Sequence, residues 1–300
     1  RINPYPYLIE ANIPRVADED YPPVDNEEVL PYGPFIKAHA NIAYGLFGTS
    51  KNGIVTGTGP GYAPHVRVID PTGTTEYGGF YAYNPQQFTA GVDVASGDVD
   101  GDGIDEIITG TMIGAPHVRV MRLNGTELGG FYAYGSSFTG GVHVATVDID
   151  GDGKKEIATI PAANSVAEVK IFTPNGTVLR SFVAYDPSFK GGGDISAGDV
   201  TGDAAPEIVT VAGPGGSAHV RVFTKDGSLI NNGFSAYEAY TGYTGSARIS
   251  VGNVRVGNVV GGFDKDEIVV APRVNGGPHM RLLQADGTPV EEGYYYEEWW

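Results

Sequence analysis

The chain has 300 residues, 45 glycines, no cysteine and a formal net charge of −17. These values exclude a disulfide-stabilised fold and argue against a nucleic-acid partner. No run of about 18 apolar residues occurs, so we predict no membrane-spanning helix. Abundant glycine with only 18% charged residues indicates a turn-rich β protein. Because the sequence opens with Arg1 instead of methionine, we expect a processed product or an excerpt.

Residues 1–34 differ in composition from the rest of the chain. They contain seven prolines and seven acidic residues. Proline fixes φ and lacks a backbone donor, which excludes a central strand here. We therefore predict an extended arm or linker over residues 1–34 and a separate β domain over residues 35–300.

The domain over residues 35–300 consists of five sequence repeats. The phrase APHVRV at 63–68 returns at 115–120 and, in altered form, three times more, so that equivalent positions lie 52, 51, 51 and 60 residues apart. Each repeat has four short segments rich in β-branched and aromatic residues, and Asn-Gly or Asp-Gly usually separates the last two. This pattern predicts an all-β fold, a β-propeller with five four-stranded blades. The alternative is that these blades are part of a seven-bladed propeller.

The segment DVDGDGIDE at 98–106 is the most distinctive part of the repeat, and DIDGDGKKE at 148–156 is a second copy of it. Clustered carboxylates on a short turn suit a hard cation with oxygen ligands, and Ca²⁺ is the predicted one. The glutamate is the ninth residue of each segment, whereas an EF-hand needs it at about the twelfth position. The flanking residues predict strands. We therefore predict two calcium loops, each joining two strands.

The predicted ligands are the loop carboxylates and one backbone carbonyl from each loop. They are Asp98, Asp100, Asp102, Glu106 and the carbonyl of Ile104 in the first loop, and Asp148, Asp150, Asp152, Glu156 and the carbonyl of Lys154 in the second. A degenerate third copy at 199–207 offers Asp199, Asp203 and Glu207. It has Thr201 and Ala204 where the pattern has aspartate and glycine. The alternative for all these loops is an acidic turn without a metal.

These motifs resemble the FG-GAP repeat proteins, whose type members are the propellers of integrin α-chains. The resemblance rests on Phe-Thr-Gly-Gly at 138–141, Gly-Ala-Pro at 114–116 and the two acidic loops, and it covers about residues 35–297. It implies structural Ca²⁺ between the first and second strands of a blade, on the lower face, and partner binding on the upper face. The first repeat has no acidic loop and the last has lost the pattern, so we predict no ion in either.

One position of each predicted inner strand varies from repeat to repeat. It reads Asn41, Asp93, His143, Asp194 and Arg248. One hypothesis is a polar channel site in which Asp93, His143 and Asp194 bind a ligand or provide a catalytic pair of carboxylates. The hypothesis that we favour is a solvated channel wall. A repeated His-x-Arg, by contrast, is predicted to pack between neighbouring blades.

The loops of the upper face vary most, and loops on a rigid scaffold commonly carry binding sites. Tyr240 and Tyr243 are predicted to be exposed there and to contact a glycan or a protein. Millimolar calcium sites favour an extracellular or cell-surface location. We therefore predict a non-enzymatic adhesion or recognition module without catalytic residues. The alternatives are a structural subunit that self-assembles through residues 1–34 and the aromatic C-terminal edge, and a polysaccharide-active enzyme.

Overall fold

The computed structural model describes residues 40–49, 51–135, 137–237, 243, 245–253, 265–273 and 280–290. These residues form nineteen strands and no helix. The described part of the chain accordingly has no helix that could cross a membrane. The predicted arm over residues 1–34, Tyr240 and the C-terminal edge lie outside the described residues.

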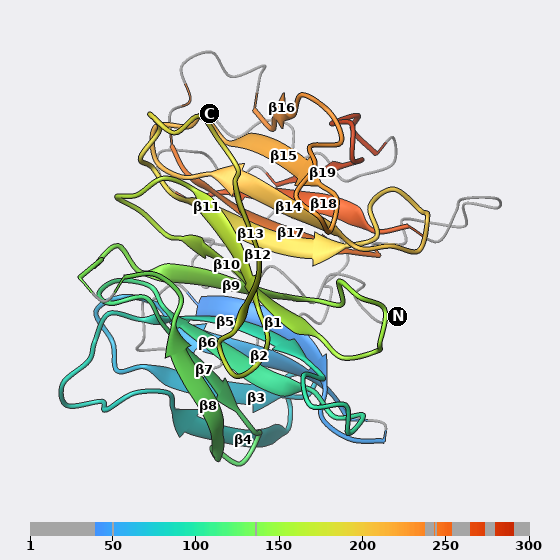
Figure 1. The fold of residues 1–300 in the computed structure, drawn as a ribbon. Helices are drawn as coiled ribbons and strands as arrows, with labels where there is room; N and C mark the ends of the chain where they lie inside the picture. The colour runs from blue at the N-terminus through green and yellow to red at the C-terminus, as the bar shows by residue number, and fades with distance from the viewer. Residues whose placement is uncertain are drawn as a thin grey trace, which may run out of the picture.

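The strands form five antiparallel sheets that follow one another along the chain (Figure 1). Blades 1 to 3 each have four strands, paired in sequential order. Their bounds are, in blade 1, β1 (Ala40–Leu46), β2 (Asn52–Thr58), β3 (His65–Ile69) and β4 (Glu76–Tyr81); in blade 2, β5 (Val92–Gly97), β6 (Glu106–Thr111), β7 (His117–Met121) and β8 (Glu127–Tyr132); and in blade 3, β9 (Val142–Val147), β10 (Glu156–Pro161), β11 (Glu168–Phe172) and β12 (Val178–Val183).

Blades 4 and 5 continue the series. Their strands are β13 (Gly193–Gly198), β14 (Glu207–Ala212), β15 (His219–Phe223) and β16 (Phe234–Ser235) in blade 4, and β17 (Ala247–Gly252), β18 (Glu267–Pro272) and β19 (Arg281–Leu283) in blade 5. Within the described residues blade 5 has three strands, and a bridge between Leu283 and Pro289 starts the pairing beyond β19. The prediction of a five-bladed, all-β propeller is confirmed.

The tight turns between the third and fourth strands lie where the Asn-Gly and Asp-Gly pairs predict them. Gly125 and Gly176 have φ values of 81° and 83°, which glycine adopts without the clash that a Cβ atom would cause. Asn124 Oδ1 accepts the N–H of Thr126 at 3.0 Å, as is common for asparagine in turns. The sequence therefore fixes these hairpins locally.

The first strands of the blades lie side by side in the order β1, β5, β9, β13, β17 and form the innermost layer. The second strands β6, β10 and β14 are buried along their whole length. The apolar core lies between blades: Val118 and Val120 of blade 2, for example, share a cluster with Val144 and Ile157 of blade 3. We call the edge with the loops between first and second strands the lower edge, and the opposite one the upper edge.

Polar side chains also join neighbouring blades. The hydroxyl of Tyr185 in blade 3 donates to the backbone carbonyl of His219 in blade 4 at 2.8 Å. The guanidinium of Arg221 donates in the other direction, to the carbonyl of Ala184 at 2.8 Å, and lies over the ring of Tyr185. The prediction that the His-x-Arg repeat links blades is confirmed.

Candidate functional site

The first acidic loop, between β5 and β6 on the lower edge, is wrapped around Asp98. Asp98 Oδ1 accepts the N–H of Gly101 at 2.6 Å, and its Oδ2 accepts the N–H of Gly103 at 2.8 Å. Asp102 Oδ1 accepts the N–H of Ile104 at 2.9 Å. These bonds turn the loop so that its carboxylates approach Glu106 at the start of β6.

The second acidic loop, between β9 and β10, has the same conformation. Asp148 Oδ1 accepts the N–H of Gly151 at 2.6 Å, and its Oδ2 accepts the N–H of Gly153 at 3.0 Å. Asp152 Oδ1 accepts the N–H of Lys154 at 2.8 Å. Because the two loops share only their aspartates, glycines and glutamate, these residues determine the turn.

In both loops three carboxylates converge. Oxygen atoms of Asp98, Asp100 and Glu106 all lie within 4.8 Å of one another, and so do those of Asp148, Asp150 and Glu156. Glu106 is only 2% exposed, and its Oε2 accepts the N–H of Val99 at 3.2 Å. Burial, together with the charges of the loop aspartates, raises the pKa of Glu106 to about 7.

This donor set fits a hard divalent cation. Burial and the facing carboxylates raise the pKa of Glu156 as well as that of Glu106, which means that the negative charges at each loop oppose one another. A divalent cation would remove this repulsion, and oxygen ligands suit Ca²⁺. Asp102 and Asp152 each use one oxygen to fix the turn. Their role as ligands, and that of the carbonyls of Ile104 and Lys154, stays a prediction.

The third loop, between β13 and β14, makes the same turn without the same convergence. Asp199 accepts the N–H groups of Gly202 and Ala204 at 2.6 and 2.8 Å. Thr201 stands where the other loops have their second aspartate. Within the described chain, the oxygens of Asp199, Asp203 and Glu207 do not gather as those of the first two loops do. Burial raises the pKa of Glu207 also.

The loops of neighbouring blades are hydrogen-bonded to one another along the lower edge. The N–H of Lys155 in the second loop donates to the carbonyl of Asp98 in the first at 2.8 Å. In blade 2 the N–H of Asp105 donates to the carbonyl of Leu46 of blade 1 at 2.7 Å, and the N–H of Leu46 donates to Asp105 Oδ2 at 2.8 Å. Sequence reasoning missed these contacts. The feature of the sequence that could have revealed these contacts is the residue directly before each loop glutamate, Asp105 or Lys155, because this residue makes them.

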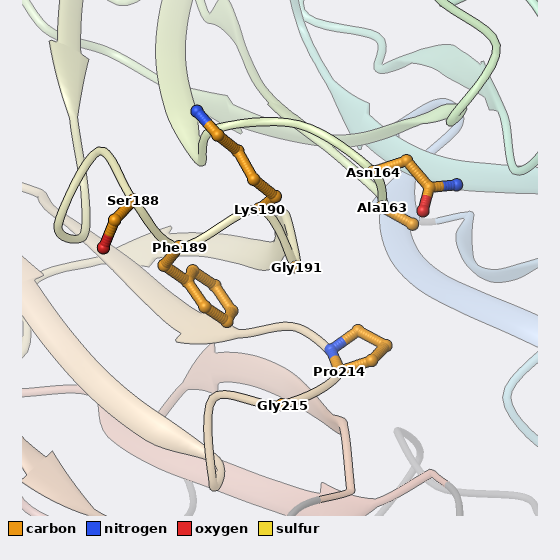
Figure 2. A pocket seen from close by; sticks show the side chains of 8 residues that line it. All are labelled: Ala163, Asn164, Ser188, Phe189, Lys190, Gly191, Pro214 and Gly215. Carbon is orange, nitrogen blue, oxygen red and sulfur yellow. The ribbon is translucent and has the colours of Figure 1, made fainter.

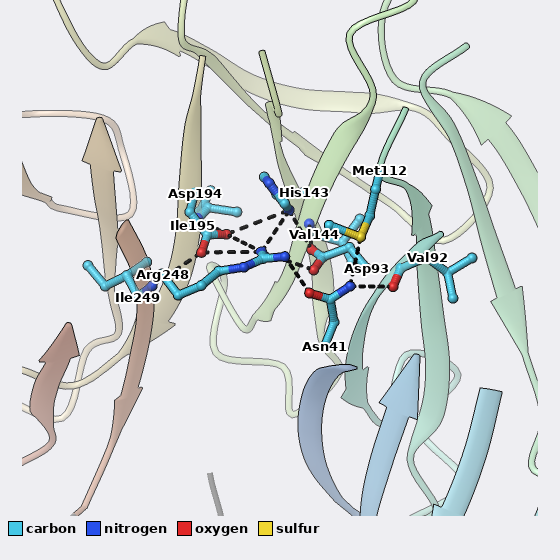
Figure 3. Close-up of polar contacts among 10 residues, drawn as sticks. All are labelled: Asn41, Val92, Asp93, Met112, His143, Val144, Asp194, Ile195, Arg248 and Ile249. Atoms are coloured by element: carbon cyan, nitrogen blue, oxygen red, sulfur yellow. Dashed lines mark hydrogen bonds and ion pairs between the residues drawn. The ribbon is translucent and has the colours of Figure 1, made fainter. Parts of the chain in front are cut away.

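Near the upper edge, four equivalent inner-strand side chains converge on the guanidinium of the fifth, Arg248 (Figure 3). Arg248 Nη1 lies 3.1 Å from His143 Nδ1 and 3.4 Å from Asp93 Oδ1 and from Asp194 Oδ2. Arg248 Nη2 donates to Asn41 Oδ1. His143 Nδ1 also lies 3.1 Å from Asp93 Oδ2. We call these five residues the axial cluster.

Four of the five residues of the axial cluster are buried, and Arg248 is partly exposed, so the prediction of a solvated channel wall is wrong. Asp93, Asp194 and His143 are 6%, 7% and 2% exposed, because the long side chain of Arg248 fills the space between them. Burial opposes ionisation, yet His143 and Arg248 hold the pKa of Asp93 at about 2. Sequence reasoning placed Arg248 on the ring but missed its contacts. A ligand-binding role for Asp93, His143 and Asp194 stays a prediction.

Acid is expected to weaken the fold through Asp93. Its pKa is depressed to about 2 from 3.8, so its stabilisation is complete above pH 3.8 and is lost as the pH falls through 2. The shift corresponds to about 2 kcal/mol. Urea unfolding between pH 5 and pH 2 in EDTA should therefore show a steeper loss for wild type than for Asp93→Asn. The matched control is Asp226→Asn at an exposed carboxylate, and equal slopes in all three proteins would contradict the assignment.

The upper edge is hollowed between blades 3 and 4 (Figure 2). The cavity has a volume of about 350 Å³ and is lined by Ala163, Asn164, Ser188, Phe189, Lys190, Gly191, Pro214 and Gly215. Lys190 Nζ donates to the carbonyl of Pro187 at 2.7 Å. The lining includes the ring of Phe189 and the polar side chains of Asn164, Ser188 and Lys190, and ligand sites generally combine apolar surface with a few polar groups. All these residues lie in loops of the upper edge, between β10 and β11, between β12 and β13, and between β14 and β15.

Tyr243 is not the exposed aromatic residue that the sequence predicts. It is half-buried, its hydroxyl donates to the carbonyl of Ser246 at 2.7 Å, and its ring meets that of Tyr237 edge-on at 5.4 Å. The ring therefore packs the loop onto the core between blades 4 and 5. Tyr240, predicted alongside it, lies outside the described residues.

Comparison with known proteins agrees with this geometry in part of the chain. The model of a family described as "FG-GAP-like repeat" matches residues 98–159, which contain both acidic loops. No curated protein matches the sequence.

Among solved structures, the chain is similar to a rhamnogalacturonan lyase of Bacillus licheniformis, with 16% identity, a TM-score of 0.44, and 84% of this chain and 59% of that chain covered. It is also similar to the exotype rhamnogalacturonan lyase YesX, with 17% identity, a TM-score of 0.43, and 81% of this chain and 49% of that chain covered. A Bacteroides caccae protein of unknown function is similar as well, with 12% identity, a TM-score of 0.49, and 84% of this chain and 80% of that chain covered. The chain thus spans only about half the length of the two lyases.

Proposed function

Because residues 98–159 form an FG-GAP-like repeat within a five-bladed propeller, we propose that this chain is a calcium-stabilised extracellular binding module. It recognises a glycan or a protein through its upper loops and does not catalyse a reaction. The observation that carries the proposal is that the two edges of the propeller differ. The lower edge has two groups of convergent carboxylates, and the upper edge has a cavity lined by loop residues.

The lower edge supplies rigidity. Asp98, Asp100 and Glu106 would hold one ion, and the matching residues of the second loop would hold another. Bound calcium supplies positive charge to a cluster of like charges. Because the N–H of Lys155 donates a hydrogen bond to the carbonyl of Asp98, a bound ion that orders one loop also restrains the neighbouring loop. Extracellular calcium is the source of ions that suits exposed loops of this kind.

The axial cluster supports a non-enzymatic function. A carboxyl group that acts as a general acid near neutral pH needs a raised pKa, whereas that of Asp93 is depressed to about 2. Arg248 also contacts both carboxylates of the ring. The two carboxylates that would have to perform hydrolysis are therefore held in ion pairs with Arg248 within the protein.

The test is a binding screen of glycans and extracellular proteins, with the ligand that binds wild type then offered to variants. Ser188→Arg places a bulky, charged side chain at the exposed rim of the cavity and is expected to lower affinity more than tenfold, by about 1.4 kcal/mol or more. Leu128→Arg, at an exposed residue of β8, is the control and should bind like wild type. Undiminished binding by Ser188→Arg would count against the upper cavity, and turnover of a bound polysaccharide that Asp93→Asn abolishes would count against a non-enzymatic role.

A further inference from the structure

The two convergent acidic loops differ in one contact. Arg122, in the hairpin after β7, donates from Nη2 to Asp100 Oδ2 at 2.9 Å and lies 3.7 Å from Asp102 Oδ2. The equivalent residue of blade 3 is Thr173, since the N–H groups of Arg122 and Thr173 make the same bond across their hairpins. Threonine carries no charge. The first loop therefore has a cation of its own on two carboxylates, and the second does not have one from this position.

The consequence appears at the second aspartate of each loop. Asp100 Oδ1 accepts the N–H of Asp102 at 3.1 Å, and Arg122 holds its Oδ2. Asp150 Oδ1 accepts the N–H of Asp152 at the same distance of 3.1 Å. Among the residues that the structure describes, nothing donates to Asp150 Oδ2. The second loop thus presents a carboxylate oxygen at the point where that of the first loop is already engaged.

Other cations near the loops do not cancel this difference. The end of the Lys154 side chain lies against Gly101, where an added Cβ atom would come 2.7 Å from Lys154 Cε. Lys154 therefore adds positive charge to the first loop. At the second loop, Lys225 Nζ donates to the backbone carbonyl of Ile149 at 2.8 Å instead of to a carboxylate.

We propose that Arg122 is a built-in counter-ion that makes the two calcium sites unequal. The second loop fills first, and the first loop fills only when calcium displaces Arg122 from Asp100. This inference rests on the proposed calcium binding. A positive charge within a few ångströms of a divalent cation repels it, and that effect is screened here because the side chains of Arg122 and Asp100 are 45% and 34% exposed. We expect the two affinities to differ about three- to tenfold.

Calorimetric titration of the full chain with calcium tests the proposal. Wild type should show two classes of site, one ion each. Asp150→Ala should remove the tighter class and identify the weaker one as the first loop. Arg122→Gln should tighten that weaker class about three- to tenfold, and Thr173→Arg, which installs the same counter-ion in blade 3, should weaken the tighter class. Arginine is compatible with this hairpin position, as Arg122 itself demonstrates.

The control is Arg180→Gln, which removes an exposed arginine paired with Asp226 and should leave both affinities unchanged. An unchanged weaker class in Arg122→Gln would overturn the proposal, and so would an unchanged tighter class in Thr173→Arg. Two sites of equal affinity in wild type would also overturn it while calcium binding itself stands. If no calcium binds at all, the proposed function fails with it.

Discussion

Replacement of Arg248 by methionine is expected to lower the free energy of unfolding by about 2–4 kcal/mol. The change leaves Asp93 and Asp194 buried without their shared cation, at 6% and 7% exposure. Methionine retains much of the apolar stem, so the loss reports the charge and its hydrogen bonds. We place the range below the full effect of a broken buried ion pair because 25% of the Arg248 side chain is exposed. Urea unfolding at pH 7 measures the difference.

The control for Arg248→Met is Arg180→Met. The side chain of Arg180 is 49% exposed, and its guanidinium pairs with the carboxylate of Asp226. This change should alter stability by less than about 1 kcal/mol. A triple variant that combines Arg248→Met with Asp93→Asn and Asp194→Asn should regain part of the loss, because no unpaired charge remains buried. Equal stabilities of Arg248→Met and Arg180→Met would contradict the role of the axial cluster.

The size of this effect follows from the topology. Arg248 lies on the first strand of blade 5, and its guanidinium contacts one residue from each of the other four blades. Successive first strands also pack side by side from β1 to β17. Arg248 therefore links the last blade directly to the first, through Asn41, as well as to its neighbour.

Calcium is expected to stabilise the wild-type protein by about 1.4–2.7 kcal/mol per loop when its concentration is ten to a hundred times the dissociation constant. Each kilocalorie corresponds to roughly 2–4 °C in a domain of this size. Asp100→Ala and Asp150→Ala should each lose the contribution of one loop. In EDTA, Asp150→Ala should be at least as stable as wild type, since the change removes a carboxylate that raises the pKa of Glu156. Thermal unfolding in about 2 mM calcium and in EDTA measures both effects.

The third loop offers the matched control for calcium. Asp203→Ala removes a carboxylate from a loop of the same shape, whose oxygens do not converge in the described structure. This variant should keep the full calcium response. A wild-type protein with the same midpoint in calcium and in EDTA would contradict the account, as would an equal loss of response in Asp203→Ala and Asp150→Ala.

Most of the fold could be predicted because it is encoded by short-range patterns that recur. Hairpins follow from turn residues such as Asn124-Gly125, whose glycine has a φ of 81°, and strands follow from β-branched segments between them. The acidic loops could be predicted equally well, because Asp98 accepts hydrogen bonds from backbone N–H groups only three to five residues further on. Local hydrogen bonds of this kind need no knowledge of the rest of the chain.

The contacts that the sequence did not disclose join residues far apart along the chain. Arg248 and Asn41 are 207 residues apart. Whether residues at these positions line a solvated channel or contact one another depends on the radius of the ring of first strands and on the length of the Arg248 side chain. Tyr243 was predicted to be exposed because its loop is polar, yet its hydroxyl donates a hydrogen bond to the carbonyl of Ser246. The pairing of Arg122 with Asp100 likewise depends on two hairpins of one blade meeting at the lower edge.

Equilibrium dialysis against calcium is the most direct test of a calcium-stabilised propeller. We expect two bound ions per chain, one ion in Asp150→Ala, and two in Asp203→Ala, because only the first two loops gather three carboxylates within 4.8 Å of one another on the lower edge of the described structure. A wild-type protein that retains no calcium would contradict it, and the acidic loops would then be turns that bind no metal.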